Sequence, residues 1–413
     1  MTEGLFPDII YILKIVWFLF SHGGWVLFVL LTIYFLFNLY MNEIQEQNLK
    51  SIEWVLLEIK PPKDNPTSFY NAEQVFIQLH QLFDNWTFQE KYLEGKTVFT
   101  VSFEIISLGG KISYLIRAPK KQRDLVEAAL YANYPNTEIT EVKDYLENFH
   151  YDPEDGRYDL FGAEFIPVKN QAFPIRTYRE FESLKGPELS EIVVDPLSPL
   201  LETFTKLSSQ EFYGIQVIIQ PVMDNSWKEE AEKEVEKVLG EKTVVSNEGK
   251  KSKVKNDMMG VDEIVKQQVT AIKNKLNRPG FKTKIRLLHL GTAEQFNKNA
   301  KKLVLSPFRV FAAGNFNSFK PAFGPKKDYR ISPTLEAAYI NYWVKNRKKD
   351  IFEGFKNRSN WVGEKTFILN TEELATIYHF PITTAATAQP IESLDVKKIQ
   401  PPANLPIEES WDL

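Results

Sequence analysis

The chemistry that the sequence suggests most directly is electrostatic, and it lies in one basic stretch. Residues 293–365 contain 15 Lys and Arg against 6 Asp and Glu, although the whole chain has a formal net charge of −4. Aromatic residues alternate with these cations. Lys and Arg attract phosphate backbones and anionic headgroups, while aromatic rings stack on unpaired bases. The candidate contacts for nucleic acid or for an anionic surface are Lys326, Lys327, Arg330, Arg347, Lys348 and Lys349.

The same stretch also has a purely structural interpretation. Tyr339, Tyr342 and Trp343 follow helical spacing, so they could pack a core while the charged residues form a solvated face. Both interpretations remain open at the level of the sequence.

Motifs for catalysis or cofactor binding are absent from the sequence, so we expect no enzyme and no cofactor. The Gly-Lys strings near Gly109, Gly240 and Gly363 lack the upstream glycine that a phosphate-binding loop requires. The five histidines have no paired spacing for zinc, and Gly-x-Ser-x-Gly does not occur. Because the chain has no cysteine, disulfides, thiolate metal sites and cysteine nucleophiles are excluded.

The elements that would position the basic stretch begin with a membrane anchor in residues 1–50. Trp25 to Met41 carries no charge, and at ~1.5 Å per residue such a helix nearly spans a hydrocarbon core of ~30 Å. Ile9 to Phe20 is too short to span, so we expect an interfacial helix there. A signal peptide is disfavoured because a positive n-region and a cleavage site are missing. The remaining alternative is a packing helix of a soluble protein.

After the anchor, the hydrophobic pattern predicts an α+β body of two domains. Residues 51–150 follow the order β-α-β-β-α-β, with Gly109-Gly110 as a hairpin turn, a helix that begins at Pro119 and a last strand near Glu138 to Val142, which predicts a ferredoxin-like domain. Residues 151–380 predict a second α+β domain that includes a mobile loop at 240–260 and the basic stretch. Residues 381–413 are rich in proline and predict an extended tail.

A short helix is predicted just before the tail. Thr371 is the expected N-cap, acidic residues fill the first turn, and Pro381 follows the end. Leu374, Ile377 and Tyr378 share one face of this helix, which makes them candidate contacts for docking on the body or on a partner.

This end of the chain resembles a known family. Phe367 to Pro381 (FILNTEELATIYHFP) and Pro401 to Pro406 (PPANLP) resemble a segment that precedes the motor domain in type IV secretion and conjugative coupling ATPases of the TraG/TraD type. Further phrases are similar to an uncharacterised family of membrane-anchored bacterial proteins associated with such ATPases: Trp86-Thr87-Phe88, Gly109-Gly110-Lys111, Arg117-Ala118-Pro119-Lys120 and Phe173 to Tyr178. The resemblance covers most of Ser51 to Pro406, and its motifs are structural rather than catalytic.

The resemblance implies a non-enzymatic accessory or scaffold subunit of a type IV secretion-like system for DNA or protein. No nucleotide-binding domain follows the Pro-rich segment here, so the ATPase would be supplied in trans. The implied location is the bacterial cytoplasmic membrane, with a single pass and the body in the cytoplasm, although too few Lys and Arg flank the anchor to fix its orientation. Two alternatives remain: a membrane-held nucleic-acid-binding module, and an envelope protein unrelated to transfer.

Overall fold

A computed structural model describes most of the chain, namely residues 14, 17–18, 20–62, 68–82, 86–147, 149–182, 195–206, 208, 211–240, 263–294, 296, 305–322 and 333–381. The predicted mobile loop after Gly240, the predicted tail after Pro381 and most of the predicted interfacial helix lie outside these residues. The chain divides into two compact units, one of Met1–Glu53 with Asp84–Val98, and one of Trp54–Phe83 with Phe99–Leu413.

The first unit is built on helix α2 (Trp25–Ser51), which follows the π-helical turn η1 (Phe20–Gly24). Among the described helices, α2 is the one long and apolar enough to cross a membrane. Its large apolar side chains from Trp25 to Tyr40 are 42–68% exposed. The long apolar helix that was predicted at the N-terminus is therefore confirmed as a helix.

A second, shorter helix, α4 (Phe88–Tyr92), packs against α2 within the same unit. A capping box fixes its start, because Thr87 and Glu90 exchange hydrogen bonds between side chain and backbone. The Tyr92 ring lies 6.2 Å from the Phe37 ring of α2. Gly95 has φ +67°, and a Cβ there would lie 2.4 Å from the carbonyl oxygen of Ile44. Only glycine allows the chain to approach α2 this closely.

The second unit is organised around one antiparallel sheet. Its described strands are β1 (Trp54–Lys60), β2 (Val101–Leu108), β3 (Lys111–Pro119), β4 (Glu138–Val142), β5 (Tyr158–Pro167), β6 (Phe212–Val222), β7 (Gly280–Thr292), β8 (Phe319–Pro321) and β9 (Phe367–Asn370). They lie in the order β4-β1-β3-β2-β6-β7-β5-β8, and β9 pairs with the beginning of β7. A mixed α+β fold with an apolar N-terminal helix, as predicted, is thus confirmed at this level.

The strand order has an internal symmetry. From its outer edge to the middle of the sheet, one half has the order β4-β1-β3-β2 and the other half has the order β8-β5-β7-β6. If the strands of each half are numbered along the chain, the two orders are the same. The halves meet where β2 pairs with β6, from Val101–Ile219 to Leu108–Phe212. The predicted domain boundary at residue 150 falls between β4 and β5, and the sheet continues across it.

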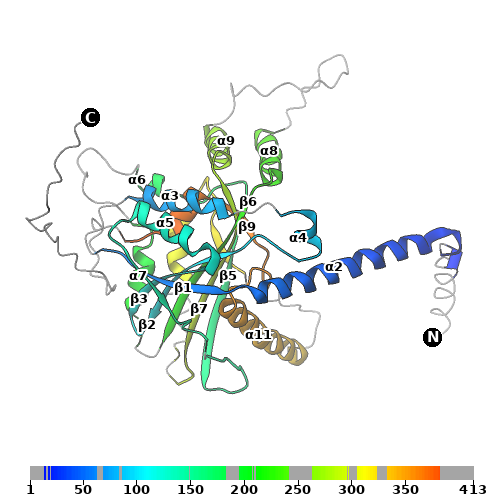
Figure 1. The fold of residues 1–413 in the computed structure, drawn as a ribbon, viewed down its shortest axis with the longest axis horizontal. Helices are drawn as coiled ribbons and strands as arrows, with labels where there is room; N and C mark the ends of the chain where they lie inside the picture. The colour runs from blue at the N-terminus through cyan, green and yellow to red at the C-terminus, as the bar shows by residue number, and fades with distance from the viewer. Residues whose placement is uncertain are drawn as a thin grey trace, which may run out of the picture. The chain divides into compact units, whose positions relative to one another are not determined.

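Helices cover both faces of the sheet. One face carries the larger core, to which α3 (Phe69–Leu79), α5 (Arg123–Asn133), α7 (Ser198–Thr205), the 3₁₀ turn η4 (Ser306–Phe311) and α12 (Thr371–Ile377) contribute. The other face is covered by the C-terminal part of α11 (Pro333–Lys356), through Ile351, Phe352 and Phe355. Figure 1 shows α3 and α5 across the sheet from α11.

Smaller elements complete the body. Helices α8 (Ser226–Leu239) and α9 (Glu263–Leu276) pack on each other and on Ala172 and Phe173. The remaining described elements are α6 (Tyr178–Glu182) and the 3₁₀ turns η2 (His80–Leu82) and η3 (Lys120–Gln122).

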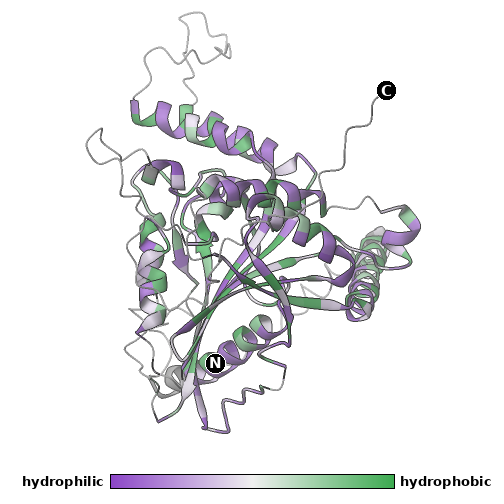
Figure 2. Ribbon diagram, turned by 60° about the vertical axis from the view of Figure 1, so that its left-hand side comes forward, coloured by the Kyte–Doolittle hydropathy of each residue, from purple (hydrophilic) through white to green (hydrophobic). Residues whose placement is uncertain are grey.

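Charged residues are placed inside the sheet. Figure 2 shows hydrophobic and hydrophilic residues side by side along the strands. On the face that α11 covers, Glu104 and Arg286 are fully buried and Glu164 is 1% exposed. Because a buried charge is costly without a partner, each must be neutralised by the elements that cover it.

Candidate functional site

The predicted basic contacts lie on α11 where they are described. Arg347 forms ion pairs with Glu164 at 3.1 Å and with Glu364 at 3.6 Å, and Lys348 forms one with Asp159. Lys349 is exposed and has no ion-pair partner among the described residues. Lys326, Lys327 and Arg330 lie outside the described residues. Two of the three described candidates are therefore neutralised within the protein.

Two of the aromatic residues that the sequence placed at helical spacing, Tyr339 and Tyr342, lie on the surface of α11. Tyr339 is 55% exposed and Tyr342 is 68% exposed, so the interpretation in which they pack inside the protein is wrong for these two rings. Trp343 is half-buried, and Phe308 and Phe319 of the basic stretch do belong to the main core. Among the described residues, neither the Tyr339 ring nor the Tyr342 ring belongs to the apolar cluster that holds Ile351, Phe352 and Phe355 of the same helix. The exposed face combines aromatic rings with Lys349.

Glu164 of β5 is the centre of a buried polar cluster that the sequence pattern did not reveal. Its Oε1 accepts a hydrogen bond from Arg286 Nε at 2.9 Å, and its Oε2 accepts one from the backbone N–H of Glu364 at 2.6 Å. Gly363 has φ +88°, and a Cβ there would lie 2.2 Å from the Glu164 carboxylate. The loop that follows α11 is thus held against the sheet by the hydrogen bond to Glu164, and the absence of a side chain at Gly363 allows this close approach.

Lys284 lies beside this cluster on β7. Its Nζ donates to the carbonyl oxygen of Val362 at 2.7 Å, and the same oxygen accepts from Arg286. Burial, reinforced by Arg286, lowers the pKa of Lys284 to about 8. The sequence contains one signal for this cluster, because Lys282, Lys284 and Arg286 occupy alternate positions of one strand.

A second buried cluster surrounds Glu104 in the centre of the sheet. Its carboxylate accepts hydrogen bonds from Arg358 at 2.9 and 3.2 Å. Ser102, Tyr145 and Gln216 donate to it as well, at 2.7, 2.7 and 3.0 Å. Burial alone would raise the pKa of Glu104, but Arg358 and these donors outweigh it, so that its pKa is lowered.

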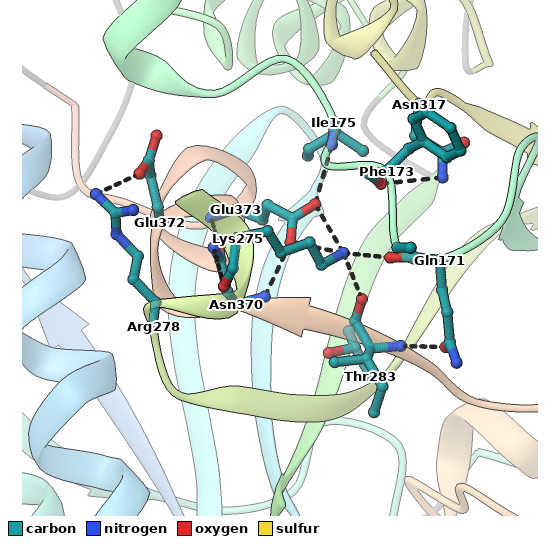
Figure 3. Close-up of polar contacts among 12 residues, drawn as sticks. Gln171, Phe173, Ile175, Lys275, Arg278, Thr283, Asn317, Asn370, Glu372 and Glu373 are labelled. Atoms are coloured by element: carbon teal, nitrogen blue, oxygen red, sulfur yellow. Dashed lines mark hydrogen bonds and ion pairs between the residues drawn. The ribbon is translucent and has the colours of Figure 1, made fainter. Parts of the chain in front are cut away.

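The third cluster surrounds the start of α12 on the opposite face of the sheet (Figure 3). Lys275, at the end of α9, is 2% exposed. Its Nζ donates to the carbonyl oxygens of Gln171 and Ile368 at 2.7 and 2.9 Å and lies 3.0 Å from Glu373 Oε2. Because three acceptors match the three N–H groups of the ammonium, this lysine ties β9 and α12 to the segment at Gln171.

Glu373 of α12 belongs to the same cluster as Lys275. It forms a capping box with Asn370, and its Oε1 accepts from the backbone N–H of Ile175 at 2.9 Å. The sequence pattern predicted Thr371 as the N-cap, and this prediction is wrong, because the N-cap is Asn370. Both residue types cap well, so the choice depends on which side chain reaches the N–H of Glu373.

A pair of nearly buried carboxylates extends the cluster along α12. Arg278 bridges Glu73 of α3 and Glu372 of α12, at 2.7 and 2.6 Å. Thr177 donates to Glu372 at 2.5 Å, and Tyr178 donates to Glu73 at the same distance. Burial, together with the neighbouring Glu73, raises the pKa of Glu372, although the hydrogen bond from Thr177 and the charges of Arg278 and Arg179 oppose this shift.

The candidate contacts on α12 lie inside the protein. Leu374, Ile377 and Tyr378 are 0–4% exposed and belong to the main apolar core. They dock the helix on the body, where a partner cannot reach them in this fold. Tyr378 packs on Phe103 of β2, with ring centroids 4.9 Å apart.

The three clusters share a chemical character. In each cluster a buried carboxylate, Glu104, Glu164 or Glu373, forms an ion pair with a cation from a segment that is distant in the sequence. Among the described residues, no three His, Asp or Glu side chains are placed to hold a metal ion together. These contacts position α11, the loop after it and α12 on the sheet.

Comparison with known proteins places the chain in a family. No curated protein matches it. A family model described as a domain of unknown function matches residues 37–392, which cover the end of α2 and almost the whole body. The chain therefore belongs to the DUF8128 family.

Proposed function

We propose that this protein is a non-enzymatic, single-pass accessory subunit that holds a separate coupling-type ATPase at the bacterial cytoplasmic membrane. The observation that carries the anchor is the exposure of 42–68% at every large apolar side chain from Trp25 to Tyr40. Such a continuous apolar surface is unfavourable in water, whereas a hydrocarbon environment accommodates it.

The polar groups of α2 support the same proposal. Thr32 donates to the carbonyl oxygen of Phe28 at 2.8 Å, and Asn38 donates to that of Tyr34 at 2.6 Å. Both side chains thus satisfy their donors within the helix. A bilayer core offers no water to these groups, so internal hydrogen bonds are what a spanning helix requires.

The accessory role rests on the resemblance of the C-terminal segment. Residues 367–381 form β9 and α12, which are buried in the core of the body. The segment that resembles the region before an ATPase motor is thus an integral part of a folded body, as expected for a membrane-side part that works with a separate motor. The body would lie in the cytoplasm, because the ATPase acts there. The order β4-β1-β3-β2, with α3 and α5 on one face, supports a ferredoxin-like arrangement of residues 51–150.

The charge pattern of the body favours positioning over catalysis. In the three clusters, the carboxylates are occupied by Arg and Lys side chains from the protein itself. A catalytic carboxylate or lysine would need an open side toward a substrate. These groups are instead used to fix the elements of the body relative to one another.

Fractionation of cells tests the anchor. The full chain should sediment with membranes and resist a high-salt wash, while a chain without residues 1–41 should be soluble and folded. Leu31→Arg with Phe35→Arg should also release the protein, since each central arginine costs about 2.5–3.5 kcal/mol on insertion. Leu31→Ala with Phe35→Ala is the matched control and should remain in membranes. Membrane retention of the truncated chain would contradict the anchor.

Affinity capture from native membranes tests the partner. The tagged full chain should co-purify a coupling-type ATPase of the same cell, and a chain cut after Pro381 should capture less of it while its body stays folded. Full capture by the shortened chain would place the contact elsewhere on the body. Absence of any ATPase from the captured material would contradict the accessory role.

Binding of nucleic acid is a second candidate, and the exposed face of α11 favours it. Tyr339 and Tyr342 are open to stacking, and Lys349 is exposed. The pairing of Arg347 and Lys348 with carboxylates leaves little charge for phosphates. Binding of single-stranded DNA by the full chain that weakens with salt, and weakens further in Tyr342→Ala with Lys349→Ala, would support this candidate.

A further inference from the structure

The first unit contains a second apolar surface besides α2. On and beside α4, Phe88 is 76% exposed and Leu93 is 63% exposed. Single exposed apolar residues are common on protein surfaces and need no explanation by themselves. Here, however, both belong to the segment that packs against α2, which gives them a defined place relative to the apolar run.

Two contacts define that place. Tyr92 packs on Phe37, which lies within the apolar run, and Gly95 lies against the backbone of Ile44, just past its end at Met41. Phe37 and Ile44 are about 10 Å apart along a helix that rises ~1.5 Å per residue. The segment from Tyr92 to Gly95 therefore runs along the end of the apolar run, at the level where hydrocarbon gives way to headgroups.

The aromatic side chains continue outward from this contact. Phe88 packs on Tyr92 with ring centroids 4.6 Å apart, so Phe37, Tyr92 and Phe88 are in successive contact. Lys91 lies 5.3 Å from the Tyr92 ring, and Lys96 lies 5.3 Å from the Trp86 ring. Aromatic rings next to lysine are the composition found where proteins meet the bilayer interface.

The charged groups of the segment are collected around Lys96. Its Nζ lies 2.9 Å from Glu90 and 3.1 Å from Glu94. Hydrogen bonds from Lys96 and Thr87 lower the pKa of Glu90 to about 2. The segment thus combines an ionic cluster, which requires water or headgroups, with the exposed apolar side chains of Phe88 and Leu93, which do not.

We propose that α4 and the residues up to Gly95 form an interfacial anchor, in which Phe88 and Leu93 insert into the lipid headgroup region beside the membrane end of α2. This inference rests on the proposed membrane anchor and adds a second lipid contact, far from α2 in the sequence. The occupant of this apolar surface is the bilayer itself, because the rings of Phe88 and Tyr92 are joined by contact with Phe37 to the surface that α2 would present to lipid.

The absence of cysteine from the chain allows a direct measurement. The full chain is prepared as Phe88→Cys, Leu93→Cys, Tyr34→Cys or Tyr70→Cys, and each is labelled with an environment-sensitive fluorophore. Tyr34 reports the centre of α2, and Tyr70 is an exposed residue of α3 in the body. The labelled proteins are placed in phosphatidylcholine–phosphatidylglycerol vesicles, with iodide on both sides or with nitroxide lipids as quenchers.

We expect labels at residues 88 and 93 to be quenched by nitroxide near the headgroup and to show iodide quenching at least three-fold weaker than at residue 70. Iodide quenching equal to that at residue 70, while residue 34 is quenched by lipid, would overturn the interfacial anchor and leave α2 in place. Iodide access to residue 34 would instead overturn the membrane anchor. The use of two sites guards against a local effect of either substitution.

The contact with α2 can be tested in the same system. Gly95→Ala adds a methyl group that would collide with the backbone of Ile44, so the label at residue 88 should become more accessible to iodide. Gly156→Ala has a similar positive φ, +69°, with no atom within 4 Å, and is the matched control. An unchanged depth in Gly95→Ala would show that packing on α2 does not position α4.

Discussion

Arg358 and Glu104 form a two-point ion pair between positions that are 254 residues apart in the sequence, with distances of 2.9 and 3.2 Å. Arg358 adopts a left-handed backbone conformation, with φ +51°, which is uncommon for a residue other than glycine. The turn after α11 is therefore held in a strained conformation by a contact with the central strand β2. We expect the stability of this turn to depend on the ion pair.

Replacing Arg358 tests that dependence. Arg358→Met would leave the carboxylate of Glu104 buried without its cation, and we expect a loss of about 3–5 kcal/mol in the free energy of unfolding. Urea unfolding of the two proteins measures the difference. Arg157→Met removes an exposed ion pair with Asp155 and should change stability little. Equal losses in the free energy of unfolding would show that the buried pair stabilises the protein no more than the exposed pair.

Gly363 and Gly156 form a matched pair for the contact at Glu164. Both have positive φ, +88° and +69°, but a Cβ would collide with Glu164 only at position 363. Gly156→Ala should cost about 1–2 kcal/mol from backbone strain alone. Gly363→Ala should cost about 1–3 kcal/mol more because a buried, ion-paired carboxylate must move. Thermal unfolding compares them, and equal losses would contradict the close approach.

Lys284 predicts how stability depends on pH. Its pKa is lowered from 10.5 to about 8 in the folded protein, so between these values the unfolded chain binds more protons. The free energy of unfolding should therefore rise as the pH increases from 8 to 10.5, by at most about 1.4 kcal/mol per pH unit from this one group. Lys284→Met should flatten the rise, as followed by urea unfolding at several pH values. An unchanged slope would mean that Lys284 keeps an ordinary pKa.

Two truncations separate α12 from the chain that follows it. A cut after Thr366 removes β9 and α12, exposes the core around Phe69 and Phe103, and should abolish cooperative unfolding. A cut after Pro381 should leave a cooperative transition of similar midpoint. Circular dichroism during heating distinguishes the two outcomes. If the protein cut after Thr366 still folded, α12 would not be required for the fold of the body.

The local elements could be predicted well where the pattern was regular. Strand β4 was predicted at its observed bounds, and Gly109-Gly110 forms the hairpin turn, with Leu108 opposite Lys111. Pro119 was predicted to begin a helix but ends β3, opposite Trp54 of β1. Proline is tolerated at the end of a strand as well as in the first turn of a helix, and only the pairing with β1 decides between them.

The buried clusters could not be predicted from the sequence, for a physical reason. Glu104, Glu164 and Glu373 are ordinary acidic residues in their local context, and their partners lie between 98 and 254 residues away. Sequence patterns report the period of a strand or helix but not which strand lies beside which. For that reason, Arg347 was recognised as a cation of interest, while the carboxylate that it pairs with was not.

The late position of α12 in the chain has a consequence for the order of biogenesis. Core residues Leu374 to Tyr378 are synthesised after almost everything that they pack against. At about 5–20 residues per second, the ribosome needs tens of seconds to proceed from α2 to α12. The N-terminal helix is thus exposed to targeting factors during a period in which the body cannot yet close. Insertion would begin on a nascent chain, and the body would fold only after α12 has been synthesised.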